Sequence, residues 1–234
     1  MAKRIYKNKD GKRVPSVTTI LGVINKPALL NWANRIGLNG IEMKNYVDDK
    51  ADIGTLAHAI CEFSLVGTPI EWGKYTKEQI LQACKCAKKF FEWKSYQNEF
   101  IPIASELELI SEKYQYGGCC DLVAILNGRL TLVDFKTCSG VWDEAKFQTS
   151  AYKQLINENF EKLLEVAINP IPKKFKKIQD VVILRIGRDE EEGFEYYPVT
   201  EVKKGFNVFK SALKLYLGKS IFAKAEKEQK KLAA

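Results

Sequence analysis

The sequence predicts an α/β protein with a mixed central β-sheet of about five strands flanked by helices. Segments with apolar residues at helical spacing fill the first part of the chain. Short alternating or continuous apolar segments follow, separated by one more helical segment. With 234 residues, 46% of them hydrophobic, the chain can close one substantial core. We therefore expect a single domain over residues 1–234, made of an N-terminal helical region (about 15–100), a sheet-containing core (about 101–218) and a basic C-terminal tail.

Helices come first in the expected order. The ordered part of the chain is expected to open near residue 14. Ser16 or Thr18 can cap the first helix, because their hydroxyls accept hydrogen bonds from free backbone N–H groups. Gly67 with Pro69 ends the third helix. The helices after the first are expected to begin after Pro27 and to cover residues 52–65 and about 76–96.

Strand patterns begin after Pro102. Asn127-Gly128 predicts the tight turn of a hairpin, and Gly117-Gly118 predicts another turn before it. The lysines among residues 173–177 predict an exposed basic loop. Strands are expected at residues 104–110, 121–126, 130–135, 181–186 and 194–199, and helices at residues 143–159 and 202–217.

The chain is basic, with 37 Lys and Arg against 29 Asp and Glu and a formal charge of +8. A positive surface concentrates polyanions and speeds their capture, so nucleic acid is the first partner to consider. Solubility alone is the plainer explanation of such a charge. Charge therefore suggests a partner without deciding it.

No apolar run of about eighteen residues is present, which excludes an ordinary membrane-spanning helix. The basic N-terminus is not followed by the apolar core of a signal peptide. We therefore expect a cytoplasmic protein with no membrane partner. In that compartment the six cysteines are expected to be reduced.

The candidate chemistry lies in the predicted hairpin, where Asp121 starts one strand and Asp134 and Lys136 close the other. Because side chains alternate along a strand, Asp134 and Lys136 share a face, while Phe135 points into the opposite layer. The hairpin returns Asp134 close to Asp121. Two carboxylates and an ammonium group suit a divalent cation and a phosphodiester. A surface ion pair is the alternative, but the apolar flanks favour a site, because an unpaired buried carboxylate is costly.

Residues on two predicted helices could join these groups. His58, the only histidine, lies one helical turn from Glu62 on a common face. A lone histidine is more often a hydrogen-bonded structural group than a metal ligand. Gln148 and Tyr152 share a face of the helix that follows Asp134 in the sequence. The alternative for this second pair is a partly buried polar pair facing solvent.

Five motifs stand in one order within residues 15–152: His58, Glu106, Gly118-x-x-Asp121, Asp134-Phe135-Lys136-Thr137 and Gln148-x-x-x-Tyr152. In this order and spacing they resemble the RecB-type branch of the PD-(D/E)XK nucleases, which includes phage exonucleases and the mitochondrial genome maintenance exonuclease. The opening at residues 15–21, followed by Leu30-x-Trp32, is also similar to phage members of that branch. The resemblance implies a restriction-endonuclease-like nuclease core.

The resemblance also implies roles for individual residues. The implied ligands of Mg²⁺ or Mn²⁺ are His58, Asp121, Asp134 and the carbonyl of Phe135. Lys136 would position or help deprotonate the attacking water, and Glu106 would support the site from the preceding strand. The residues implied to organise the site or the DNA are Gln148, Tyr152 and Thr137.

Two positions depart from the pattern of this family. Cys120 precedes Asp121 where the family has proline, and Asp134 stands where it has glutamate. The branch tolerates both changes. Some relatives carry an iron–sulfur cluster on one upstream cysteine and three cysteines near the C-terminus. Since no cysteine follows Cys138, no iron–sulfur cluster is expected here.

The residues and the resemblance together indicate a metal-dependent DNA exonuclease of phage-type DNA processing or recombination, located in the host cytoplasm if phage-encoded. One alternative is an endonuclease or nickase of the same fold. The other is a non-catalytic DNA-binding recombination module. The clustering of Asp121, Asp134, Lys136 and His58 argues against this module, because a scaffold gains nothing from it. DNA is the expected partner, and the sequence indicates no oligomeric state.

Overall fold

The computed structural model, which describes residues 4–24, 26–219, 221 and 229, is built around one five-stranded sheet in the order β3-β4-β5-β6-β7. Neighbouring strands pair antiparallel except β5 and β6, which run parallel. The strands are β3 (Phe100–Ser111), β4 (Tyr116–Leu126), β5 (Arg129–Lys136), β6 (Asp180–Ile186) and β7 (Phe194–Pro198). The predicted class, a mixed α/β sheet flanked by helices, is confirmed. The predicted basic C-terminal tail lies almost entirely outside the described residues.

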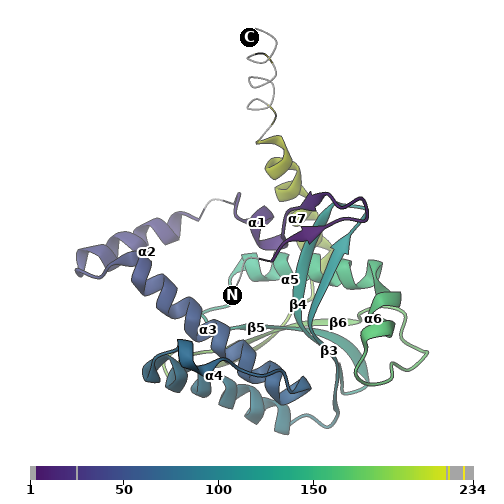
Figure 1. Ribbon diagram of the computed structural model, residues 1–234, viewed down its shortest axis with the longest axis horizontal. Coiled ribbons are helices and arrows are strands. Elements are labelled where there is room, and N and C mark those ends of the chain that lie inside the picture. Colours follow the sequence, from purple (N-terminus) through teal and green to yellow (C-terminus); the bar gives the residue numbers. More distant parts are fainter. Residues whose placement is uncertain (1–3, 25, 220, 222–228, 230–234) are drawn as a thin grey trace.

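Helices cover both faces of this sheet (Figure 1). One face packs against α3 (Met43–Val66) and α4 (Lys77–Ser95) through a buried cluster that includes Phe90 and Phe135. The other packs against α1 (Val17–Leu21), α5 (Asp143–Glu158) and α7 (Val202–Gly218). The remaining helical elements are α2 (Pro27–Leu38), the 3₁₀ helix η1 (Trp72–Lys74) and α6 (Phe160–Val166). Within the described residues, none of these helices has the length and apolar character needed to cross a membrane.

Several predicted helix ends are confirmed by their caps. The Ser16 hydroxyl accepts a hydrogen bond from Thr19 N at 3.0 Å and starts α1. Gly67 ends α3 with φ 76°, a left-handed conformation that glycine adopts without strain. However, α3 begins at Met43 rather than at residue 52. Its first turns lie beside α2, which has no buried residue, so they carry no continuous apolar stripe for a sequence pattern to detect.

The chain is ordered well before residue 14, which corrects the predicted start. Strands β1 (Tyr6–Lys7) and β2 (Arg13–Val14) form a short antiparallel hairpin. This hairpin joins β4 through the hydrogen bond from Gly117 N to Pro15 O, 2.9 Å long. Short strands of this kind carry too few residues to show a periodic pattern. The Asp10-Gly11 pair is the one turn signal that could have revealed the hairpin.

The predicted turn at Gly117-Gly118 is wrong, since both glycines lie inside β4 and the turn falls at residues 112–115. Their lack of side chains serves close packing instead. The ring of Tyr6 fills the space that a Cβ on Gly117 would need. A Cβ on Gly118 would lie 2.6 Å from Cε1 of Tyr152. The two glycines therefore let the N-terminal hairpin and α5 approach β4 directly beside the candidate site.

Candidate functional site

The regular pairing of β4 and β5 ends where Asp121 and Asp134 face each other. Strands β4 and β5 are paired from Leu126 and Arg129 to Leu122 and Val133, and the next position along is the pair of aspartates. There the side chain of Asp121 takes the place of a ladder bond, because its Oδ2 accepts a hydrogen bond from Phe135 N at 2.8 Å. The hairpin thus returns Asp134 close to Asp121, as the sequence predicts.

Asp134 is an almost fully buried carboxylate, with 1% of its surface exposed. Its Oδ2 lies 2.5 Å from Nζ of Lys136, an ion pair without hydrogen-bond geometry. Neither carboxylate oxygen accepts a hydrogen bond from a described residue. Burial, with Lys136 opposing and Asp121 adding to it, raises the pKa of Asp134 to about 6. Lys136 is therefore the charged partner of this buried carboxylate, whose oxygens have no hydrogen bond from the described residues.

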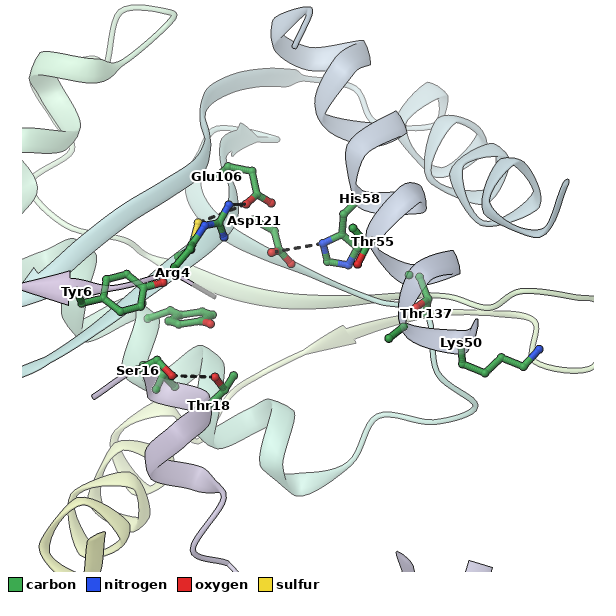
Figure 2. Close-up of a pocket in the computed structure, with 16 residues that line it drawn as sticks. Arg4, Tyr6, Ser16, Thr18, Lys50, Thr55, His58, Glu106, Asp121 and Thr137 are labelled. Atoms are coloured by element: carbon green, nitrogen blue, oxygen red, sulfur yellow. Dashed lines mark hydrogen bonds and ion pairs between the residues drawn. The ribbon is translucent and has the colours of Figure 1, made fainter. Parts of the chain in front are cut away.

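His58, Glu106 and Asp121 form a group that could hold a metal ion, since one donor atom from each lies within 4.8 Å of the others. His58 reaches the group from α3, and its Nδ1 lies 3.6 Å from Oδ1 of Asp121 (Figure 2). Burial lowers the pKa of His58, but the Asp121 carboxylate outweighs burial and leaves it raised. Burial raises the pKa of Asp121, but His58, Lys136 and the Phe135 N–H together leave it lowered.

Glu106 belongs to this group rather than only supporting it from the preceding strand. Its backbone leaves the regular ladder, with φ 49°, between the registered neighbours Ser105 and Leu107. This left-handed conformation is uncommon for a residue with a side chain, and such strain gathers at functional sites. The Cys119 thiol donates to Glu106 Oε2 at 3.4 Å. A second partner, which the sequence pattern does not predict, is Arg4, whose Nη2 lies 2.6 Å from the same oxygen.

A cavity of about 400 Å³ opens onto this group. Residues of the N-terminal hairpin, α1, α3, β3 and β4 line it, and the basic ones are Arg4 and Lys50. Helix α3 comes close to the end of β5 at Gly54, where a Cβ would lie 2.7 Å from Oγ1 of Thr137. This close approach places His58, one helical turn later, beside Asp121. Thr137 lines the cavity with them.

The remaining predicted residues divide between the site and its surroundings. Tyr152 lines the cavity, and its hydroxyl accepts a hydrogen bond from Gln148 Nε2 at 2.9 Å. Phe135 packs in the layer opposite Asp134, as predicted, and its carbonyl as a ligand stays a prediction. Glu62 accepts a hydrogen bond from Thr68 at 3.0 Å and does not join His58 in the group of three.

A comparison of the chain with models of known protein families finds no match, and a comparison with curated proteins finds none either. The interpretation of the site therefore rests on its geometry and chemistry.

The donors present suit a divalent cation. An imidazole and two carboxylates in one group are ligands that Mn²⁺ accepts readily, and carboxylate oxygens also suit Mg²⁺. Asp134 lies outside this group of three, but its buried carboxylate is next to Asp121, accepts no hydrogen bond from the described chain and is paired with Lys136. His58, Glu106 and Asp121 are therefore the residues that would hold the ion, and Asp134 is the neighbouring carboxylate that could add a fourth ligand.

Replacing His58 with alanine is expected to weaken Mn²⁺ binding at least about tenfold, because the group of three loses its only imidazole. Isothermal titration with Mn²⁺ measures this effect. The matched control is Glu62→Ala, one turn along the same helix, which should bind Mn²⁺ as the wild type does. Unchanged metal affinity together with a lowered melting temperature would make His58 a packing residue.

Proposed function

We propose that this protein is a metal-dependent deoxyribonuclease that hydrolyses phosphodiester bonds, and that it acts as an exonuclease. One observation carries the proposal. The buried carboxylate of Asp134, without hydrogen bonds and paired to Lys136, lies next to Asp121, which shares a candidate metal group with His58 and Glu106. An acidic cation site with an adjacent ammonium group is the minimal set for phosphodiester hydrolysis. The resemblance to the PD-(D/E)XK nucleases supports the same reaction.

The side chains divide the work. When bound, a divalent cation polarises the phosphate and favours ionisation of a water molecule. His58, Glu106 and Asp121 would supply its ligands, with Asp134 beside them as a further carboxylate. Lys136 holds its Nζ proton and a positive charge beside Asp134, where that charge stabilises the negative charge that builds up during attack. Tyr152, with its hydroxyl held by Gln148, orients groups at the cavity wall.

DNA is the proposed substrate because the chain is basic and two cationic side chains line the cavity beside its acidic group. Arg4 and Lys50 line the cavity, and the chain carries a formal charge of +8. Phosphates of a bound strand would compensate these charges. A cytoplasmic location, in the host if the protein is phage-encoded, belongs to the same proposal.

The test of activity uses end-labelled linear DNA and covalently closed circular DNA, each with Mg²⁺, Mn²⁺ or EDTA. We expect cleavage of the linear DNA with either metal, none with EDTA, and no cleavage of the circle. Cutting of the circle would make the protein an endonuclease or nickase. Binding without any cleavage would favour a non-catalytic DNA-binding module. Asp121→Asn is the inactive control.

DNA affinity is expected to fall steeply as salt rises, because each lysine or arginine contact to a phosphate releases condensed counterions. The logarithm of the binding constant should fall with the logarithm of salt concentration by about 0.9 per contact on a duplex. Titrating the Asp121→Asn variant at several ionic strengths measures the slope without cleavage. A flat response would contradict the proposal that lysines and arginines of this protein contact DNA phosphates.

A further inference from the structure

The N-terminal hairpin places one arginine against the candidate metal group (Figure 2). Arg4 lines the cavity, with its side chain 33% exposed. Its Nη2 lies 2.6 Å from Oε2 of Glu106, and its Nε lies 2.9 Å from Oε1 of Glu108. Only Glu106 of these two acids belongs to the group with His58 and Asp121. Arg4 therefore holds a residue that a cation would also need.

The position of Arg4 is built into the fold. Two residues farther along, Tyr6 lies over Gly117, where no side chain could fit beside its ring. The hairpin is also tied to the turn before β4 by a 2.7 Å hydrogen bond from Asn8 to Gln115. These contacts hold the backbone of the hairpin at the site. A change at Arg4 would then involve its long side chain rather than movement of the strand.

A divalent cation in this group would share the Glu106 carboxylate with the Arg4 guanidinium. Two positive charges on one carboxylate repel each other, so the cation and the Glu106–Arg4 ion pair oppose each other. A guanidinium turned from Glu106 would keep Glu108 at its Nε, and its other N–H groups would face the cavity. A phosphate is the anion that this planar set of donors binds best, often through two parallel hydrogen bonds.

We propose that Arg4 is a substrate-binding residue whose release from Glu106 by the bound cation makes it available to a DNA phosphate, so that metal and DNA bind cooperatively. This inference rests on the proposed nuclease function. It goes beyond that function by coupling two binding steps through one side chain. Reciprocity follows: DNA that engages Arg4 frees Glu106 and tightens metal binding by the same factor.

The first arm of the test measures Mn²⁺ affinity without DNA by isothermal titration. Arg4→Gln should bind Mn²⁺ about threefold to tenfold more tightly than the wild type, since it removes a partly exposed ion pair that opposes the cation. Arg13→Gln, in strand β2 of the hairpin that follows Arg4, is the matched control and should leave the affinity unchanged. If Arg4→Gln does not fold, Arg4→Lys replaces it and should tighten Mn²⁺ binding by a smaller factor.

The second arm measures the salt dependence of binding to a short DNA duplex, with Ca²⁺ or with EDTA, on DNA checked to be intact. With Ca²⁺, Arg4→Gln should lower the salt slope by about 0.9, the value of one phosphate contact. With EDTA the two proteins should have equal slopes, because Glu106 retains Arg4. Equal Mn²⁺ affinities, or the same loss of slope with and without metal, would overturn the coupling.

The two proposals fail in different ways. A wild-type protein that binds no Mn²⁺ and cleaves no DNA overturns the nuclease function, and the role of Arg4 with it. A wild-type protein that binds Mn²⁺ and cleaves DNA, beside an Arg4→Gln variant that behaves identically in both arms, overturns only the role of Arg4. In that case the arginine is a structural ion pair of the hairpin.

Discussion

Replacing Lys136 with alanine is expected to lower the rate of DNA cleavage by about 10² to 10⁴, while DNA binding changes by less than about threefold and Mn²⁺ binding does not weaken. The Nζ of Lys136 lies 2.5 Å from Asp134, and the side chain is 22% exposed. Burial lowers the pKa of Lys136, but Asp134 and Asp121 outweigh burial and leave it raised. The group therefore carries its positive charge at neutral pH. Its stabilising effect is largest in the transition state, where negative charge develops on the phosphate.

Two further variants distinguish this role from general loss of a buried cation. Lys89 is also partly buried and donates to Gly187 O at 2.8 Å, away from the site, so Lys89→Ala should lose stability and keep its cleavage rate. Lys136→Arg keeps the charge with a different shape and should retain part of the activity. Single-turnover cleavage and Mn²⁺ titration measure both properties. Wild-type turnover by Lys136→Ala would show that the Asp134–Lys136 pair is an ordinary ion pair without a catalytic role.

The centre of the site follows from local sequence pattern. Alternation along one strand places Asp134 and Lys136 together and Phe135 in the other layer, and the Asn127-Gly128 turn brings Asp121 back to them. These relations depend on residues close in the sequence. The five strands and the mixed sheet were predictable for the same reason, since each strand carries its own apolar pattern.

The rest of the site depends on packing between distant segments. A Gly-Gly pair in the sequence can mark either a turn or a place where an aromatic ring packs on the backbone. Gly117 and Gly118 are glycines because the rings of Tyr6 and Tyr152 pack against them, which only the structure shows. Arg4 meets Glu106 because a hairpin with two-residue strands docks on β4, and such strands leave no periodic signal. Glu106 belongs to the metal group and has a left-handed backbone conformation, and no sequence pattern predicts that conformation.

The buried carboxylate of Asp134 is expected to make the protein less stable as pH rises. Its pKa is raised from 3.8 to about 6, so the folded protein holds a proton that the unfolded chain has released. The stabilisation is complete below about pH 4 and is lost as pH rises through 6. The difference between the two pKa values corresponds to about 3 kcal/mol. The cation site therefore costs stability at neutral pH when no metal is supplied.

Asp134→Asn keeps the shape of the side chain and removes its titration. In EDTA, the free energy of unfolding of this variant relative to the wild type should rise by about 2 kcal/mol between pH 4 and pH 7.5, the larger part of the full difference. Urea unfolding at each pH measures the difference. Asp180→Asn is a control of opposite sign, because its ion pair with Arg129 lowers the pKa of Asp180. That variant should lose stability relative to the wild type only as pH rises toward about 4, and the difference should stay nearly constant between pH 4 and pH 7.5.

Adding Mn²⁺ at pH 7.5 completes the test of Asp134. A cation bound by the ionised carboxylate stabilises only the folded wild type, so its melting temperature should rise with metal concentration. Asp134→Asn should show a smaller rise and no detectable cleavage, although it is the more stable protein in EDTA. A difference between the two proteins that stays constant with pH would mean that Asp134 titrates as an ordinary carboxylate. In that case the ion pair with Lys136 would satisfy its charge without a metal.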